Sequence, residues 1–383
     1  MIRVIAVFII LTATVQAREF HYLARSPKAL LMGDAFTAIA DDEYTLFYNP
    51  ASLSKHKGLS VFFINPDVSA TNVLGETDKF ENFPSRDPVA IADRVIGIPL
   101  HLHAAAIPGL KLESFGINLF ANVTANAELR NRTHPALDVD YRYDRGFIFG
   151  YSFSLGKGFK ARKPSRKKQN SKKSNVSGST TSFGVSVKNM NRQGIYDSYD
   201  LFGQELLNII AEGKTDDYHD IRNSLGYSKG SAWGVDTGFE FAWTSKISQF
   251  STGLSVMDVG GTKYKRESGV GAIPDQEMAI NWGIAWRQDF WIIDYALTFD
   301  VHPINSAVDY RRKIHFGMEF GIPLISAMFG WSGGYISYGA QFEFWPLKVI
   351  GGFYGTEIGG GYRQEEGKRA LIYVSILHFS FDA

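Results

Sequence analysis

From Gly58 to the end of the chain, bulky apolar residues alternate with small or polar residues in one segment after another. A period of two places alternate side chains on opposite faces of a β-strand. In Phe115–Ala127, for example, Phe115, Ile117 and Leu119 share one face, and Gly116 and Asn118 share the other. The clearest segments of this kind are Phe115–Ala127, Phe147–Leu155, Trp233–Trp243, Met278–Trp286, Trp291–Val301 and Ile314–Phe320. The alternation lasts about 9–11 residues, which is the length that a tilted strand needs to cross a bilayer.

The two faces of these segments differ in a way that favours a membrane over a water-soluble core. The bulky face is strongly aromatic, and the opposite face carries Gly, Ser and Ala rather than Lys and Glu. A soluble sandwich or propeller is the alternative, with the bulky face as its core, but its other face would then be solvated. We therefore predict an all-β fold, a transmembrane antiparallel β-barrel. About fourteen strands are expected, and they begin near Val61, Ile98, Phe115, Phe147, Phe183, Val235, Phe250, Ile280, Ile293, Phe316, Ala327, Tyr338, Ile350 and Ile372.

The last strand, Leu371–Phe381, ends in an aromatic residue and is followed by Asp382 and Ala383. Leu371, Tyr373, Leu377, Phe379 and Phe381 are expected on its lipid face. Its other face would then be Ile372, Val374, Ile376 and His378. This assignment predicts an apolar lumen, which suits either an apolar cargo or a closed and plugged barrel.

The N-terminal residues do not follow the two-residue period. Residues 1–17 have the features of a secretory signal: Arg3, an apolar run over Val4–Val15, and a small-residue cleavage site at Ala17. The apolar run of about 12 residues is short for a membrane anchor, which needs roughly 20. Residues 18–57 are rich in small apolar residues and include a run near helical spacing, which predicts a short helix. We expect residues 18–57 to form a plug in the mouth of a barrel built by residues 58–383.

The plug sequence resembles the N-terminal signature of the FadL-like and PorV-like outer-membrane β-barrel proteins, a superfamily that transports hydrophobic compounds. The matching residues are Met32-Gly33-Asp34-Ala35-Phe36, Ala38, Ala40-Asp41-Asp42 and Tyr48-Asn49-Pro50-Ala51-Ser52-Leu53. The resemblance implies fourteen strands with a hatch inside the barrel. It also implies that Asn49, Pro50 and Ala51, with Gly33 and Phe36, take part in gating. Asn49 can bond to exposed backbone and start a turn that Pro50 stiffens.

Three interruptions break the strand pattern. Residues 66–95 show no clear period and are expected to form a long loop, and residues 157–176 form a basic, low-complexity insert. By strand parity the insert lies on the periplasmic side. Residues 195–231 are expected to form an external helical loop, with Asp200 as helix cap and Gly213 as its end. Its apolar face would pack on the barrel rim or capture a ligand, and it consists of Leu201, Phe202, Leu206, Leu207, Ile209 and Ile210. Of these, Leu201, Phe202, Leu206, Ile209 and Ile210 are the candidate ligand-binding residues.

Several kinds of chemistry find little support in the sequence. The chain has no cysteine, so disulfides and thiolate nucleophiles are excluded, and its net charge of +1 does not favour nucleic acid. His101 and His103 have ligand-like spacing, but two polar residues in a barrel wall are the simpler interpretation, and we predict no metal and no cofactor. A hydrolase at the barrel rim would use His315 or His378, but no nucleophile motif accompanies them. We therefore do not expect an enzyme.

The resemblance and the predicted apolar lumen together favour one function over another. The first is transport of hydrophobic small molecules, similar to long-chain fatty acids, by passive diffusion through a plugged barrel. The alternative is a PorV-like role, in which the barrel is a docking or assembly partner of an envelope or protein-secretion complex. In both cases we expect the mature chain in the outer membrane of a Gram-negative cell. Its expected partners are the bilayer, lipopolysaccharide, a hydrophobic ligand and, in the second case, an envelope protein.

Overall fold

The computed structural model describes residues 19–56, 58–73, 94, 96–130, 136–156, 177–200, 225–245, 247–290 and 292–381. The predicted helical loop around Leu206, the basic insert at 157–176, and residues 1–18 lie outside these ranges, apart from the ends of the loop. Within the described residues, no helix is both long enough and apolar enough to cross a membrane.

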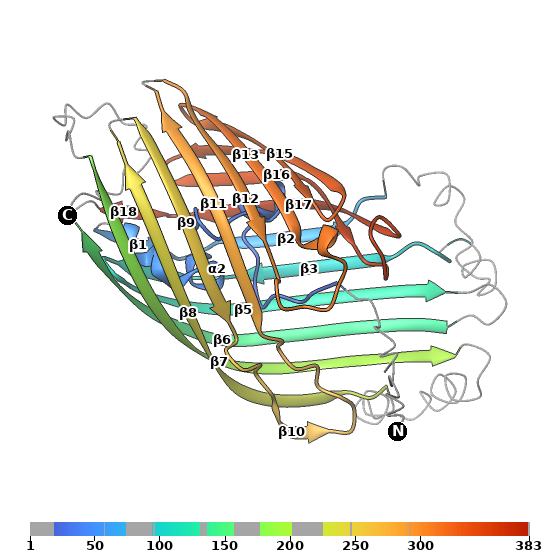
Figure 1. The fold of residues 1–383 in the computed structure, drawn as a ribbon. Coiled ribbons are helices and arrows are strands. Elements are labelled where there is room, and N and C mark those ends of the chain that lie inside the picture. The colour runs from blue at the N-terminus through green and yellow to red at the C-terminus, as the bar shows by residue number, and fades with distance from the viewer. Residues whose placement is uncertain are drawn as a thin grey trace, which may run out of the picture.

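Antiparallel strands form a closed barrel (Figure 1). In the described part of the chain these are β1 (Leu59–Phe62), β2 (Pro66–Thr71), β3 (Leu100–Ala106), β4 (Gly109–Leu112), β5 (Phe115–Arg130), β6 (Ala136–Gly156), β7 (Gly178–Asp200), β8 (Ser228–Thr244), β9 (Ser248–Met257), β10 (Lys265–Gly269), β11 (Ala279–Asp289), β12 (Asp294–Val301), β13 (Ile314–Ile322), β14 (Ile325–Ser332), β15 (Tyr335–Phe344), β16 (Leu347–Glu357), β17 (Glu366–Ile376) and β18 (Phe379–Phe381). The barrel closes where β17 pairs with β2 and β18 pairs with β1.

We call each position in the barrel wall a stave, whether one strand or two strands in line occupy it. Four staves are built from two strands in line: β1 with β2, β3 with β4, β9 with β10, and β17 with β18. The pairing shows this directly, since β3 and β4 both pair with β5, and β9 and β10 both pair with β8. The barrel therefore has fourteen staves, as the sequence predicts.

The residue range 66–95 is not loop throughout, because Pro66–Thr71 is strand β2. Pro66 is the first residue of that strand, where a missing backbone donor is tolerated.

The two ends of the barrel differ in their connections. At one end most strands are joined by short turns, for example at Glu113–Ser114 and at Trp345–Pro346, and β18 ends there; the connection between β6 and β7, residues 157–177, is the long exception. At the other end the loops are longer, as between β9 and β11 and between β12 and β13, where the short 3₁₀ helix η2 (Tyr310–Lys313) lies. Bacterial barrels place short turns in the periplasm and long loops outside. We call these ends the short-turn end and the long-loop end.

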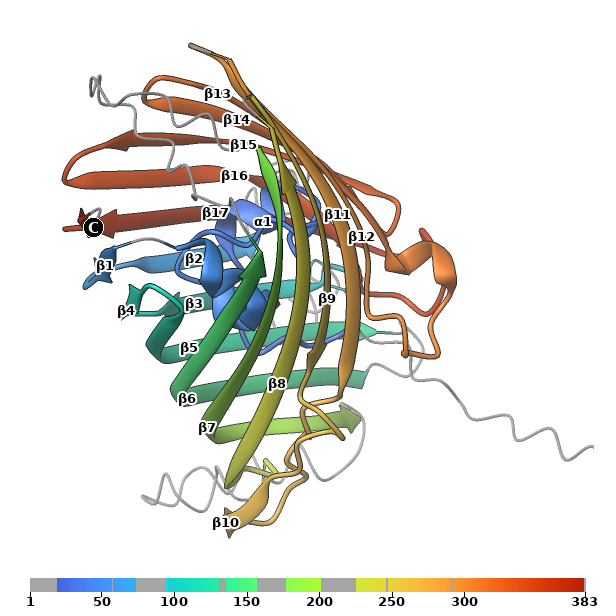
Figure 2. The ribbon, with the colours of Figure 1, turned by 60° about the vertical axis from the view of Figure 1, so that its left-hand side comes forward.

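Strands β6 and β7 are much longer than a bilayer requires. They have 21 and 23 residues, and β7 spans roughly 75 Å at ~3.3 Å per residue. They extend the wall at the long-loop end (Figure 2). β7 continues to Asp200 and β8 begins at Ser228, so both ends of the range 195–231, predicted as a loop, are strand.

Large apolar side chains cover the outside of the barrel. Trp233 is 64% exposed and Leu155 is 61% exposed, and the bulky faces predicted for Phe115–Ala127 and Phe147–Leu155 do point outwards. A belt of this kind on a closed barrel is stable only in a bilayer, because water would not solvate it. The fold is therefore that of a membrane barrel.

Residues 19–56, which we call the inner segment, lie inside the barrel in both views (Figure 1 and Figure 2). The segment contains α1 (Pro27–Leu31), α2 (Thr45–Tyr48) and the 3₁₀ helix η1 (Pro50–Lys55). Ser26 caps α1 with its side-chain oxygen, and Pro27 occupies the first helical turn, where it costs no hydrogen bond. Helices this short are marginal in isolation, so their stability comes from burial against the barrel wall.

Candidate functional site

Inward-facing glycines form the seat of the inner segment. A Cβ atom on Gly150 would lie 2.2 Å from Leu46, one on Gly339 would lie 2.4 Å from Leu31, and one on Gly330 would lie 1.9 Å from the backbone nitrogen of Gly33. The other glycines that contact the segment in this way are Gly116, Gly184, Gly238, Gly253, Gly317 and Gly352. The small inner face seen in the sequence is therefore filled by the inner segment at these positions.

The turn at Gly33 and Asp34 contacts the wall most closely. Both residues have left-handed backbone, with φ of +65° and +64°, and a side chain on Gly33 would lie 2.5 Å from the backbone oxygen of Phe316. Glycine is needed there for both reasons. His302 donates from Nε2 to the Asp34 carbonyl at 2.9 Å, and His315 donates from Nδ1 to the Gly33 carbonyl at 2.9 Å. These histidines thus fix the backbone of the turn.

The residues predicted for gating all lie at this seat. Asn49 is fully buried, and its Oδ1 accepts a hydrogen bond from the Ala51 backbone N–H at 3.1 Å. Its Nδ2 donates to the carbonyls of Thr37 at 3.2 Å and Phe239 at 3.3 Å. One amide therefore joins its own turn, another part of the inner segment and the wall strand β8.

Phe36 packs edge-on against Tyr48 with ring centroids 5.2 Å apart. Tyr48 donates a hydrogen bond to Asp34 Oδ1 at 2.7 Å, next to Gly33. The two halves of the sequence signature, which are separated along the chain, therefore meet in space. Their role in gating remains a prediction.

Carboxylates of the barrel wall hold the inner segment at several points. Asp300 on β12 accepts the backbone N–H groups of Phe36 at 2.8 Å and Thr37 at 2.7 Å. Glu240 on β8 accepts the Ser52 hydroxyl at 2.6 Å and forms an ion pair with Lys55. Glu319 on β13 pairs with Lys28 at 2.9 Å. The partners of these carboxylates lie far away along the chain, so the sequence carries no local signal for the contacts.

The acidic run Asp41-Asp42-Glu43 lies at the short-turn end. Arg287 Nη2 contacts Asp41 at 2.8 Å, and the Lys111 ammonium donates to the backbone carbonyls of Asp41 at 2.9 Å and Asp42 at 2.6 Å. Tyr373 donates a hydrogen bond to Glu43. Burial, together with the neighbouring Glu43, raises the pKa of Asp42 to about 6. Groups from β4, β11 and β17 thus hold this part of the inner segment from different sides of the barrel.

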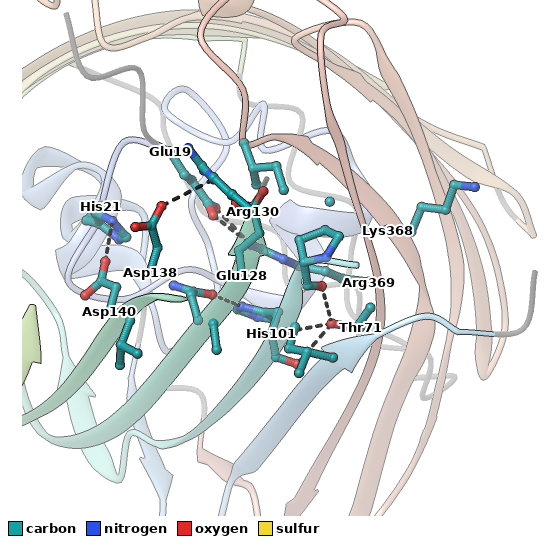
Figure 3. Close-up of a pocket in the computed structure, with 17 residues that line it drawn as sticks. Glu19, His21, Thr71, His101, Glu128, Arg130, Asp138, Asp140, Lys368 and Arg369 are labelled. Atoms are coloured by element: carbon teal, nitrogen blue, oxygen red, sulfur yellow. Dashed lines mark hydrogen bonds and ion pairs between the residues drawn. The ribbon is translucent and has the colours of Figure 1, made fainter. Parts of the chain in front are cut away.

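A pocket opens at the long-loop end, and we call it the mouth pocket (Figure 3). It holds about 700 Å³ of space, partly open to solvent. Its walls come from the ends of β2, β3, β5, β6 and β17 and from Ile358, which follows β16, and its floor includes Glu19 and His21 of the inner segment. Its aliphatic residues on the lumen side are Pro99 and Ile358, whereas Leu100, Ala127 and Val139 border it from the outward-facing row of the sheet. Its charged and polar lining includes Glu19, His21, His101, Glu128, Arg130, Asp138, Asp140, Lys368 and Arg369.

Arg369 and Glu19 form a two-point ionic contact in the pocket. Nη1 and Nη2 of Arg369 bind the two oxygens of Glu19 at 3.0 and 2.6 Å. Arg25 also donates to Glu19 at 3.2 Å and contacts Asp34 Oδ2 at 3.0 Å. Burial by itself would raise the pKa of Glu19, but Arg369 and Arg25 hold it well below its usual range.

The predicted apolar lumen is wrong. Ile372 is 54% exposed and Ile376 is 39% exposed on the outside, whereas Leu371, Tyr373 and Ser375 are buried on the inside. Both faces of this strand are largely apolar, so the period of two could not tell which face is which. The buried inner face of the barrel carries many charged and polar residues, among them Asp67, Lys111, Asp144, Lys188, Arg192, Asp236, Glu240, Asp300, Glu319 and Lys348.

Two further sequence predictions concern ligands. The candidate residues Leu201, Phe202, Leu206, Ile209 and Ile210 lie outside the described residues, so that site remains a prediction. His101 and His103 stack with centroids 6.4 Å apart. His101 bonds to Asn126 at 2.7 Å and His103 to Thr124 at 2.9 Å. No group of three or more metal-ligating side chains occurs within the described ranges.

Comparison with known proteins gives similarities in solved structures only. No family model matches the chain, and no curated protein sequence matches it. The toluene transporter TbuX of Ralstonia pickettii aligns with a TM-score of 0.40 and 9% identity, over 94% of this chain and 100% of its own. The monoaromatic hydrocarbon channels CymD and TodX (the latter a deltaS2 mutant) align with TM-scores of 0.39 and with 10% and 9% identity, over 95% and 94% of this chain and 100% of theirs. The assignment as a fourteen-stave membrane barrel rests on the strand pairing of the chain itself.

Proposed function

We propose that this protein is an outer-membrane barrel that admits small hydrophobic or amphipathic molecules by diffusion, with the inner segment as its gate. One observation carries the proposal. Glu19 and His21, at the beginning of the inner segment, form part of the mouth pocket. A molecule in this pocket therefore touches the element that fills the barrel.

The lining of the mouth pocket suits a molecule with an apolar body and a polar end. Pro99 and Ile358 offer aliphatic contact, and Arg369 offers charge. Such mixed linings are typical of sites that orient a small ligand. The polar inner wall does not form an apolar channel around the inner segment. We therefore infer that passage requires the segment to move, rather than a path that is permanently open.

The contacts of the inner segment are compatible with movement. They are hydrogen bonds, ion pairs and side-chain packing, and no strand of the segment joins the barrel sheet. Each hydrogen bond contributes only about 0.5–1.5 kcal/mol net, because water replaces it when the contact opens. A gate held by many such bonds is closed at rest and opens without disrupting the barrel.

A disulfide between the segment and the wall tests this proposal. Ser54 Oγ donates to Ser182 Oγ of β7 at 2.6 Å, so the paired substitutions Ser54→Cys and Ser182→Cys place two thiols in contact. The chain has no native cysteine to interfere. We expect oxidation to abolish uptake of fatty acids, alkanes or aromatics by cells that carry the double variant, and reduction to restore it. Each single variant is the matched control. Unchanged uptake after complete cross-linking would rule out a moving gate.

The overhang of β6 and β7 supports a second candidate function, docking of another envelope protein. Both strands continue well beyond the bilayer at the long-loop end and present a surface above it. Affinity purification from native membranes separates the two functions. A stable stoichiometric protein partner supports docking. Recovery of the barrel without one, together with uptake that the disulfide blocks, supports transport.

A further inference from the structure

Two arginines converge on a single carboxylate at the floor of the mouth pocket. Arg369 on β17 binds both oxygens of Glu19, and Arg25 of the inner segment binds one of them. We propose that Arg369 and Arg25 form a binding site for the carboxylate of an amphipathic ligand, and that Glu19 fills this site in the resting protein. The inference rests on the proposed function and adds the chemistry of the ligand head group and its competition with the chain itself.

The geometry of the arginine pair suits a planar anion. Two parallel N–H···O contacts at 3.0 and 2.6 Å are the bidentate arrangement that guanidinium groups form with carboxylates. The side chain of Arg369 is 6% exposed and that of Glu19 is 14% exposed, so the contact is largely shielded from water. The Nε atoms of Arg369 and Arg25 are buried and find no hydrogen-bond partner among the described residues. The site therefore has more donors than Glu19 uses.

Charge balance favours exchange of one carboxylate for another. Arg25 and Arg369 carry two positive charges, and Glu19 and Asp34 supply two negative charges. If Glu19 leaves alone, a buried arginine loses its counter-ion, which is costly. If a ligand carboxylate enters as Glu19 leaves, the charge of the site does not change. A neutral ligand cannot make this exchange.

The rest of the pocket can hold the apolar part of such a ligand. Pro99 and Ile358 line the same space as Arg369 and Glu19. Figure 3 shows Glu19 and Arg369 close together among the charged side chains of the pocket. A ligand with its carboxylate on Arg369 would therefore direct its chain along this lining.

The site is connected to the seat of the inner segment. Arg25 bonds to both Glu19 and Asp34, and Asp34 accepts the hydroxyl of Tyr48 at 2.7 Å. Tyr48 directly precedes Asn49, which bonds to the wall. Displacement of Glu19 changes the partners of Arg25 and so reaches the Gly33–Asp34 turn. Binding of a carboxylate would thus weaken the closed state at the contacts that hold it.

Calorimetric titration of the full-length protein in nanodiscs tests the site. The probes are octanoate and octanol at neutral pH, which have the same chain length but differ in charge. Removing the internal competitor with Glu19→Gln should tighten octanoate binding about tenfold and leave octanol binding unchanged. Arg369→Met should weaken octanoate binding at least about tenfold, with octanol affected less than about twofold.

Arg130→Gln is the matched control. Arg130 lines the same pocket but pairs with Glu128 and Asp138 instead of Glu19, so octanoate binding should not change. If Glu19→Gln disturbs folding, Glu19→Asp supplies the second variant, because it keeps the charge and shortens the reach. It should tighten octanoate binding by less than Glu19→Gln. Circular dichroism verifies the barrel in each case.

The results separate this inference from the proposed function. Equal losses for octanoate and octanol in Arg369→Met, or unchanged octanoate affinity in Glu19→Gln, would overturn the carboxylate site. If octanol still binds and the Ser54–Ser182 disulfide still blocks uptake, transport stands without the site. If neither compound binds and the disulfide has no effect on uptake, both ideas fail.

Discussion

The hydroxyl of Tyr48 donates a hydrogen bond to the carboxylate of Asp34 at 2.7 Å, inside the barrel. This contact joins the Met32–Phe36 part of the inner segment to the Tyr48–Ala51 part. Asn49 then joins the second part to β8, and His302 and His315 join the first part to the wall near β13. The inner segment is therefore held as one folded unit, and changes at its contacts should alter gating more than barrel stability.

Removing the carboxylate of Asp300 should loosen the inner segment. Asp300→Ala leaves the backbone N–H groups of Phe36 and Thr37 without their acceptor, at a cost of about 1–3 kcal/mol for each buried group. We expect faster hydrogen exchange in residues 36–40 while the barrel strands stay protected. Asp300→Asn keeps one acceptor oxygen and should show a smaller effect. Equal exchange in all three proteins would show that Asp300 does not hold the segment.

Adding one methyl group to the glycine seat should hold the gate open. In Gly330→Ala the new Cβ would lie 1.9 Å from the backbone nitrogen of Gly33, so the segment or the wall must move. We expect higher conductance in planar bilayers and faster entry of small solutes. Gly351→Ala is the matched control, because its new Cβ would have no neighbour nearer than 3.7 Å. A Gly330→Ala barrel as closed as Gly351→Ala would contradict the close fit.

The closed state should become less stable as pH rises through about 6. Burial and Glu43 raise the pKa of Asp42 from 3.8 to about 6 in the folded protein. A carboxyl with a raised pKa is protonated without penalty below its unfolded pKa, and it costs stability once pH passes the folded value. Open probability in planar bilayers should therefore increase from about pH 5 to about pH 7.5.

Asp42→Asn is the variant that checks this assignment. It keeps a polar side chain of the same size but cannot ionise, so the rise in open probability around pH 6 should disappear. The pKa values of Asp41 and Glu19 are shifted down, so those groups titrate at lower pH and do not produce this rise. A rise that persists in Asp42→Asn must come from another group.

Asn65 should be required for the strength of the barrel wall. β1 is interrupted before β2, and β3 before β4, and Asn65 bridges the gap between these staves. Its Nδ2 donates to the Ile107 carbonyl at 2.7 Å, and its Oδ1 accepts the Ile107 N–H at 3.0 Å. Asn65→Ala leaves two buried backbone groups unpaired and should lower the free energy of unfolding by about 2–4 kcal/mol.

Asn65→Asp gives a graded comparison, because it keeps the acceptor and loses the donor. Urea unfolding in detergent micelles, followed by tryptophan fluorescence, should place it between the wild type and Asn65→Ala. If Asn65→Ala unfolds at the wild-type midpoint, water replaces the side chain at the gap.

The barrel strands could be predicted from the sequence because the alternation that marks each strand lies within a few consecutive residues. All fourteen predicted strand starts fall in, or within two residues of, different staves, since each transmembrane strand repeats the same two-residue period. Pro66–Thr71 was missed because a six-residue strand that begins with proline gives too little alternation to be recognised. Its stave was still identified through Val61 in β1.

The site was less predictable, because its contacts join residues far apart in the chain. The signature located Gly33, Phe36, Asn49, Pro50 and Ala51, and all five lie at the seat. Asp300 binds the backbone of Phe36 and Thr37, and Arg369 binds Glu19. The residues next to Asp300 and Arg369 in the sequence do not indicate these partners. The outward face of β17 was also assigned wrongly, because both of its faces are apolar.

The amino-acid sequence by itself determined the class of the protein: the strand period and the aromatic face opposite small residues favour a barrel with its apolar surface in lipid over a soluble sandwich or propeller. The tertiary structure decided what the barrel contains. Closure of the sheet brings strands distant in sequence around one lumen, so the charges of β8, β12, β13 and β17 meet the inner segment only in the folded chain. A period of two specifies which side chains share a face, but only closure specifies what that face contacts.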